Sequence, residues 1–311
     1  MPDPRDAPDR APTLLSRWAG LSGNVRGVLF IVVGAFLLIV MAGLVKHLGQ
    51  SLPVFEVLFV RFLAGLIVLL PLFWKIGFAS LRTNRLPMHM ARGFVGTLGN
   101  VCFFFTLIHL AIADSVTLQF SRPMNMIVIA MAFLGEPFRI NRGLATLIGF
   151  AGILMITRPF GDGFQPWALV GVAGAFFGTL VVLTVKLLSR TEQTMTIMFY
   201  FALWTTIMSA IPALLSWQWP TLTEWLLLAL TGTLGIVGQS MFTHGIGLGE
   251  TTFVLPFDYL HIVYSVLTGI VAFAELPGLW SWVGMAVIIG ASLYLLRTDA
   301  AGRTLGEKPS T

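Results

Sequence analysis

The sequence is poor in charge and in cysteine. Only 11% of its 311 residues are charged and 56% are hydrophobic, whereas a soluble domain has about 25% charged residues. This balance excludes a soluble enzyme, because too few charges remain to cover a water-facing surface, and it excludes a disordered chain. The single cysteine, Cys102, excludes an internal disulfide and a cysteine-based metal cluster. No P-loop, His-Glu-x-x-His or Gly-x-Ser-x-Gly pattern is present to indicate enzymatic chemistry.

Long apolar segments fill most of the chain. Each is about as long as the ~20 residues that a helix needs to cross a bilayer, and turn or breaker residues separate them. We therefore predict an all-α integral membrane protein with ten transmembrane helices. The predicted spans are 26–46, 54–74, 87–108, 114–134, 143–160, 166–188, 195–215, 222–244, 251–273 and 279–297.

The basic residues predict the orientation of these spans. With the N-terminus in the cytoplasm, only Lys46 and Arg158 fall on the outer side, and Arg61, Arg92 and Arg122 stay within spans. All other Lys and Arg residues fall inside, as the positive-inside rule requires. The net charge of +5 therefore reflects topology and indicates no nucleic acid. We expect both termini in the cytoplasm and a multi-pass protein surrounded by lipid in a bacterial inner membrane.

The two halves of the chain repeat one another. The letters Gly-Thr-Leu-Gly at 96–99 recur at 232–235, and Val-Lys at the end of the first span (Lys46) recurs at the end of the sixth (Lys186). Because each repeat has five spans, the second must be inverted in the membrane. Inverted repeats are typical of secondary transporters, whose substrate site lies near the midplane. The expected units are a tail at 1–25, repeats at 26–160 and 166–297, and a tail at 298–311.

The fourth span carries a polar face. Ser115, Gln119 and Arg122 lie on one side of an ideal helix, with Asn125 on its flank. Pro123 interrupts the backbone hydrogen bonds beside Arg122. Because a charge within a span costs a few kcal/mol, it usually faces a cavity or a partner. We favour a substrate-binding cavity; a structural ion pair or snorkelling of Arg122 is the alternative.

The ninth span carries Asp258 and His261, three residues apart. A neighbouring acid raises the pKa of a histidine, so the two form a candidate proton relay, with a purely structural hydrogen-bonded pair as the equal alternative. Tyr259 and Tyr264 are candidate ligand contacts through stacking or hydrogen bonding. They are equally typical of core aromatics.

Four further polar or aromatic residues lie within spans. Arg61 is a candidate substrate anchor or inter-helix ion-pair partner. Trp204 is a candidate for stacking on an aromatic or cationic solute, with helix packing or lipid exposure as the alternative. Asn100 and Gln239 lie beside the repeated glycines and are candidate substrate ligands or ordinary inter-helix hydrogen-bonding groups. Arg92 is near the cytoplasmic end of its span, which favours a lipid headgroup contact.

Two features favour structural roles. Glu136 and Glu275, at the ends of the fourth and ninth spans, are expected to form loop or helix-end hydrogen bonds. Gly174 and Gly178 form a GxxxG pattern, which is typical of close helix packing.

These features resemble the drug/metabolite transporter superfamily, in particular permeases built from two EamA-type domains, over about residues 26–297. Members of this superfamily often have a proline a few residues after the position of Tyr259. Here His261, Ile262 and Val263 occupy that stretch. The motifs that carry the resemblance are Lys46, Glu56, Arg61, Arg92, Pro123, Gly135, Glu136, Pro256, Phe257, Tyr259, Glu275 and Pro277. The resemblance implies a carrier for a small organic solute.

The sequence thus predicts a secondary active transporter for a small polar organic metabolite, such as an amino-acid-like solute or a vitamin, working by alternating access. A proton is a candidate coupling ion, and Arg122 and Arg61 favour an anionic solute unless acids neutralise them. A multidrug or cation exporter of the same superfamily is the alternative, and an intramembrane enzyme the alternative from another class. No cofactor and no metal is expected, and a monomer and a homodimer are both open.

Overall fold

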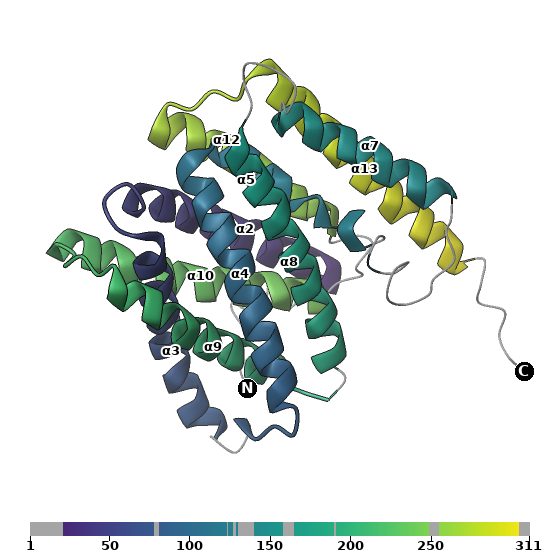
Figure 1. The fold of residues 1–311 in the computed structure, drawn as a ribbon. Coiled ribbons are helices and arrows are strands. Elements are labelled where there is room, and N and C mark those ends of the chain that lie inside the picture. Colours follow the sequence, from purple (N-terminus) through teal and green to yellow (C-terminus); the bar gives the residue numbers. More distant parts are fainter. Residues whose placement is uncertain are drawn as a thin grey trace, which may run out of the picture.

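The computed structural model describes residues 21–77, 81–122, 124–126, 129, 140–157, 165–189, 191–248 and 255–304. Within these ranges every regular element is a helix and no strand occurs (Figure 1). Six of the helices are long and apolar enough to cross a membrane, and shorter apolar helices accompany them. The predicted all-helical membrane fold is confirmed at this level.

The helices follow the predicted spans closely. Apolar runs of this length form helices in a membrane because each backbone group then finds its partner within the segment. The first half contains α2 (Gly23–Leu48), α3 (Val54–Ile76), α4 (Leu86–His109), α5 (Ile112–Gln119) and α7 (Ile140–Thr157). The second half contains α8 (Pro166–Leu188), α9 (Thr194–Leu215), α10 (Leu222–Leu248), η2 (Leu255–Tyr259), α12 (Leu260–Phe273) and α13 (Leu279–Thr304).

The fourth and ninth spans are not continuous α-helices. Helix α5 ends at Gln119, where the N–H groups of Phe120 and Ser121 bond three residues back instead of four. The ninth span begins with the 3₁₀ turn η2 before α12. Both interruptions lie beside a proline in the sequence, which has no N–H to continue a helix. The two breaks meet, because the Phe120 ring stacks on Tyr259 with centroids 5.1 Å apart.

The most extensive helix contacts are preserved when the two halves are exchanged. Helix α2 packs against α10 as α8 packs against α4, and α3 against α10 as α9 against α4. Likewise α12 contacts α2 as α5 contacts α8. The pairs α3–α9 and α7–α13 map onto themselves, and the latter lies at one side of the molecule in Figure 1. The halves are therefore related by a pseudo-two-fold arrangement.

Glycines allow the closest of these helix pairs to approach. A Cβ atom on Gly174 of α8 would lie 3.0 Å from the Cβ of Cys102 and 3.5 Å from the Gly99 carbonyl oxygen of α4. A Cβ on Gly34 of α2 would lie 2.9 Å from the Gly238 carbonyl oxygen of α10. Such backbone approach is the packing that small residues permit in membranes, and it agrees with the role expected for the GxxxG of α8.

The α2–α10 contact predicts a position-dependent effect on stability. We expect Gly238→Leu to lower the melting temperature of the detergent-solubilised protein by several degrees, since overpacking costs about 1–3 kcal/mol. Gly247→Leu in the same helix is the matched control, because a side chain there meets nothing within 4 Å. Both changes gain the same helix propensity. Equal melting temperatures for the two variants would contradict this account.

Candidate functional site

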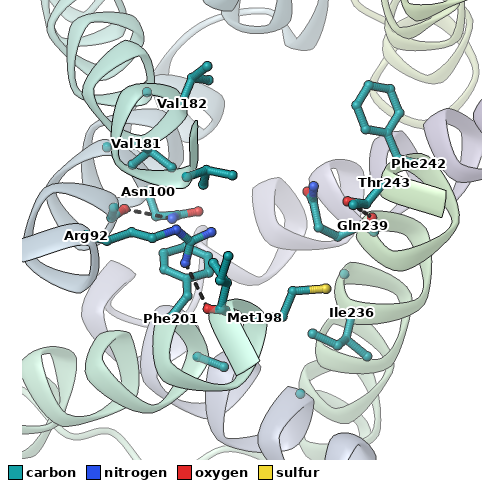
Figure 2. A pocket seen from close by; sticks show the side chains of 18 of the residues that line it. Arg92, Asn100, Val181, Val182, Met198, Phe201, Ile236, Gln239, Phe242 and Thr243 are labelled. Atoms are coloured by element: carbon teal, nitrogen blue, oxygen red, sulfur yellow. Dashed lines mark hydrogen bonds between the residues drawn. The ribbon is translucent and has the colours of Figure 1, made fainter. Parts of the chain in front are cut away.

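A cavity of about 600 Å³ lies between the two halves. Both copies of the repeated Gly-Thr-Leu-Gly line it, through Gly96 and Gly99 of α4 and Gly232 and Gly235 of α10. In Figure 2, Arg92 and Asn100 lie on one wall, and Gln239, Thr243 and Phe242 lie across from them. Because the glycines carry no side chains, Phe201 and Arg61 can lie close to Gly96 and Gly235 at the cavity wall.

The cavity reaches one end of the helix bundle. Its lining extends to Ser189 and Thr194, at the connection between α8 and α9, and to Ile246 near the end of α10. No described residue from the opposite end of the bundle, where α2 ends and α3 begins, lines it. The cavity is therefore a one-sided opening that ends near the middle of the helices.

Three arginines of the first half line the cavity, and each contacts the second half. Arg61 of α3 lies beside Gly235, where a Cβ would be 2.9 Å from its Nη2. Its guanidinium lies over the rings of Phe62 and Phe104, 4.6 and 5.3 Å from their centroids. Its Nε and Nη1 are buried without a hydrogen-bond partner.

Arg92 and Arg122 are held by protein acceptors. Arg92 is buried, donates from Nη1 to the Ile197 carbonyl oxygen at 3.1 Å, and lies over the Phe201 ring. Arg122 donates from Nη2 to Gln119 Oε1 at 3.1 Å and interacts electrostatically with Asp258. The lipid headgroup contact expected for Arg92 is thus replaced by a contact with the facing helix.

The predicted polar face of the fourth span is divided by the break after Gln119. Gln119 and Arg122 line the cavity, whereas Ser115 is fully buried and donates to the carbonyl oxygens of Thr106 and Ala111, each at 3.0 Å. The amide nitrogen of Asn125 is buried without a hydrogen-bond partner and does not line the cavity. A regular helix would have presented all of these side chains together, but the backbone rotates the face at the break.

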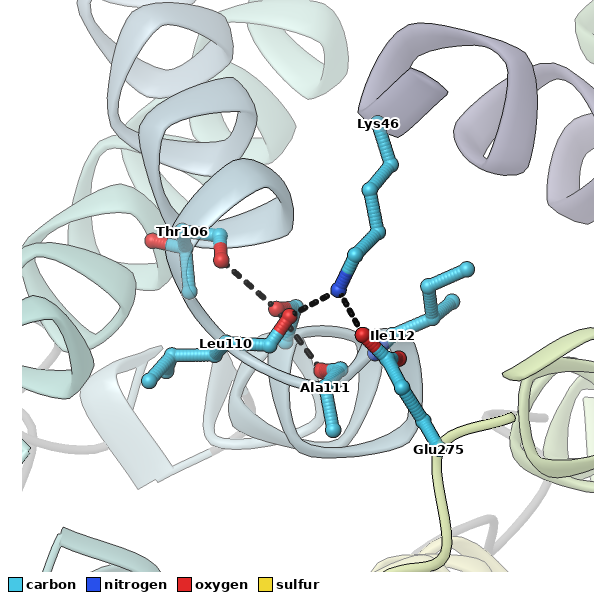
Figure 3. A network of polar contacts seen from close by, with 7 residues as sticks. Lys46, Thr106, Leu110, Ala111, Ile112 and Glu275 are labelled. Carbon is cyan, nitrogen blue, oxygen red and sulfur yellow. Dashed lines mark hydrogen bonds and ion pairs between the residues drawn. The ribbon is translucent and has the colours of Figure 1, made fainter. Parts of the chain in front are cut away.

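A buried polar network closes the opposite end of the bundle (Figure 3). Lys46, at the end of α2, forms an ion pair with Glu275 and donates to the Leu110 carbonyl oxygen at 2.6 Å. The other oxygen of Glu275 accepts from the Ile112 N–H, the first residue of α5, at 3.1 Å. We call Lys46, Leu110, Ile112 and Glu275 the closed-end network. It joins the first half to the α12–α13 connection of the second.

A second buried acid reinforces this end. Glu56 of α3 is fully buried and accepts from the Gln218 N–H, just before α10, at 3.0 Å. The ring of Trp167, at the start of α8, stacks on His109 at the end of α4 with centroids 3.7 Å apart. Contacts between the two halves therefore seal the end away from the cavity opening.

Residues 25–158 and 165–297 each match the model of the EamA-like transporter family. This chain belongs to the EamA-like transporter family. It is 33% identical to a pseudopaline exporter of Pseudomonas aeruginosa over 88% of this chain and 96% of that protein. It is 31% identical to a riboflavin transporter of Brucella anthropi over 80% and 90% of the two chains. The resemblance stated from the sequence is confirmed, and these relatives are transporters, not enzymes.

Further similarities agree with this assignment. An S-adenosylmethionine uptake transporter of Rickettsia bellii is 29% identical over 82% of this chain and 87% of its own length. A crystal structure shares the fold with a TM-score of 0.61 and 22% identity, covering 90% of this chain and 99% of that one. The protein is a multi-pass membrane transporter with two EamA repeats.

The structure of this EamA-like transporter sorts the remaining sequence candidates by position. Asn100 and Gln239 line the cavity, and Asn100 donates to the Gly96 carbonyl oxygen at 2.8 Å. Trp204 packs against Gly93, and Tyr264 meets the ring edge of Phe36. With Tyr259, which stacks at the helix break, these aromatics do not belong to the lining. Their roles as substrate ligands stay predictions.

Asp258 and His261 are in contact beside the cavity. Their Oδ1 and Nδ1 atoms are 2.8 Å apart, and the His261 ring meets the edge of Phe242, which lines the cavity. The contact fits both the relay and the structural pair, so the coupling role stays a prediction. Within the described part of the chain, no group of three or more His, Cys, Asp or Glu side chains is arranged to hold a metal ion.

Sequence reasoning did not single out several lining residues. Thr243 lies one turn from Gln239 and could have been found from helical periodicity. Phe201 fills the space above Gly96 across the interface between the halves, so only tertiary packing reveals it. Pro123 and Glu136 lie outside the described residues.

Proposed function

We propose that this transporter is a secondary carrier that moves a small organic metabolite across the inner membrane by alternating access of two inverted five-helix halves. The observation that carries the proposal is the cavity between the repeats, open at one end and closed by buried contacts at the other. Substrate sites between the halves are typical of secondary transporters.

The packing pattern supports inversion of the halves. Exchanging them preserves the helix pairs, and an odd number of spans per repeat turns the second repeat over. The positive-inside rule places the α8–α9 connection, with Lys186 and Arg190, in the cytoplasm. The cavity opens beside this connection, so the conformation is open to the cytoplasm, and the closed-end network lies on the outer side.

The size and lining of the cavity support a small organic solute. Its volume of about 600 Å³ falls within the ~300–1,000 Å³ of small-molecule sites. The relatives are named for pseudopaline, S-adenosylmethionine and riboflavin, which are the first solutes to assay. Among the described lining residues there is no Asp or Glu, so these residues offer no carboxylate to pair with a cationic solute.

Counterflow in reconstituted vesicles tests the carrier. We expect vesicles preloaded with a metabolite panel that includes these three solutes to show saturable exchange of at least one labelled member. Val182→Trp should reduce that exchange at least about tenfold, because the side chain lines the cavity and a larger one fills it. Leu169→Trp, an exposed position on the same helix outside the lining, is the control. No exchange of any solute would refute the carrier, and exchange that Val182→Trp leaves unaffected would show that the solute does not pass through this cavity.

A further inference from the structure

The deep end of the cavity holds a guanidinium that makes no hydrogen bond. Arg61 Nε and Nη1 are buried without a partner, and none of the described carboxylates forms an ion pair with Arg61. A charge inside a membrane protein is costly unless it is paired, and an unsatisfied buried charged group is costlier than a neutral one. Resting on the proposed function, we propose that Arg61 binds the acidic group, a carboxylate or phosphate, of an organic anion that this transporter carries.

Among the described residues of the helices that pack against α3, the one acid is Glu224 of α10, which accepts from Ser51 and Thr221. Glu275 pairs with Lys46, Asp258 contacts His261, and Glu56 accepts from the Gln218 N–H. None of these described acids forms an ion pair with Arg61, so its positive charge is not neutralised where it lines the cavity.

Arg61 also differs from the other two arginines of the lining. Arg92 donates to the Ile197 carbonyl oxygen, and Arg122 donates to Gln119 and interacts with Asp258. Their charge makes the cavity attractive to an anion. Arg61, with its donors unused, is the group that can bind an acid directly.

The surroundings of Arg61 fix its orientation and offer its Nε and Nη1 no acceptor. The rings of Phe62 and Phe104 hold the guanidinium by cation–π contacts. Any side chain at Gly235 would come within 2.9 Å of Nη2 and 3.1 Å of Nε. A glycine at this position keeps space for the planar fork, which suits bidentate binding of a carboxylate or phosphate.

The other lining residues indicate what kind of molecule carries the acidic group. Phe62, Phe103, Phe201 and Phe242 supply apolar and aromatic surface, and the amides of Asn100 and Gln239 supply hydrogen-bonding groups. The ligand class is therefore an organic acid with an apolar or aromatic body, and small inorganic anions would use only part of the site.

Matched neutral and anionic probes test this assignment on the purified full-length protein in detergent. One pair of probes is N-acetylphenylalanine and its neutral amide, and the other is riboflavin 5′-phosphate and neutral riboflavin. Binding of each probe is measured by thermal unfolding and by titration. We expect at least one anion to stabilise the wild type and its neutral partner to bind at least about tenfold more weakly, as loss of a charge-assisted hydrogen bond predicts. The anion that binds decides between carboxylate and phosphate.

Variants at position 61 separate a ligand anchor from a structural arginine. Arg61→Gln should weaken anion binding at least about tenfold while leaving the melting temperature of the empty protein unchanged or higher, because an unpaired charge is removed. A structural arginine would instead lower it. Arg61→Lys should retain part of the binding as a point charge, and Arg82→Gln, exposed outside the cavity, should retain all of it.

Three results would overturn the assignment. The first is equal binding of an anion and its neutral partner, and the second is equal anion binding by Arg61→Gln and the wild type. The third is no stabilisation by either anion at about 10 mM, a concentration that would nearly saturate a site with a Kd of ~1 mM. Exchange of neutral solutes that Arg61→Gln leaves unchanged would refute this inference and keep the carrier. Anion binding through Arg61 without exchange of any solute would refute the carrier and keep the site.

Discussion

Lys46→Met is expected to open the outer end of the cavity. The change leaves the half-buried Glu275 without its cation, and leaving such a group unpaired costs about 1–3 kcal/mol. The closed-end network exists only while the outer end is closed, so this cost falls on the inward-open conformation. At about 1.4 kcal/mol per tenfold, this cost shifts the ratio of the two conformations toward the one with an open outer end by a factor on the order of ten. In a Cys102→Ala background, Asn100→Cys should react with an impermeant maleimide from the outer face at least about tenfold faster when Lys46 is replaced.

Two further variants make this expectation specific. Without the Lys46 change, Asn100→Cys should react from the cytoplasmic face, because Asn100 lines the cavity and we propose that the cavity opens to that face. Ser51→Ala removes an exposed hydrogen bond to Glu224 at the same end and should have little effect. Glu275→Gln, which keeps an acceptor for the Ile112 N–H, should act in the same direction if Lys46→Met does not fold. Unchanged outer-face labelling in both folded variants would show that the pair is not part of a gate.

Asp258→Asn and His261→Ala are each expected to abolish accumulation driven by a pH gradient. The relay hypothesis requires the pair, which lies next to Arg122 and beside the cavity wall at Phe242, to exchange a proton and thereby change the charge that a bound solute meets. We expect at least about a tenfold loss of gradient-driven uptake of a solute identified by counterflow. Exchange itself, which needs no net proton movement, should stay within about twofold of wild type.

The control for coupling is His244→Ala. His244 lies on α10, meets the edge of Phe30 and does not line the cavity, so its loss should leave both assays unchanged. If Asp258→Asn and His261→Ala both keep full dependence on the pH gradient, the pair is structural and the relay hypothesis fails.

Much of the fold could be predicted from the sequence because a bilayer accepts few structures. Backbone groups in lipid must be bonded within their own segment, so the length and polarity of each apolar run determine a helix, and α8 spans the predicted residues 166–188. The breaks at Phe120 and in η2 were harder to predict. A proline removes one donor, but the geometry of the following turn depends on contacts such as the stacking of Phe120 on Tyr259.

The candidate site was predictable only in part. Arg61, Gln119 and Arg122 could be found because ionisable or amide groups within a span require an explanation, and the structure places them along one cavity. Arg92 differs from expectation, since it finds its partner on a helix of the other half. Glu275 forms the expected kind of helix-end hydrogen bond, to the Ile112 N–H, and in addition pairs with Lys46 of the other half. Such partners are distant in sequence and follow from how the repeats pack.

The sequence by itself determined a helical membrane transporter of two EamA repeats, because hydropathy, the distribution of basic residues and the repeated Gly-Thr-Leu-Gly act through local physics that needs no tertiary contact. The tertiary structure decided which end of the bundle is closed and which arginine remains unbonded. Both depend on side chains from opposite halves meeting, as Lys46 meets Glu275 and Arg61 meets Gly235 without an acceptor. The packing of the two repeats brings these groups together.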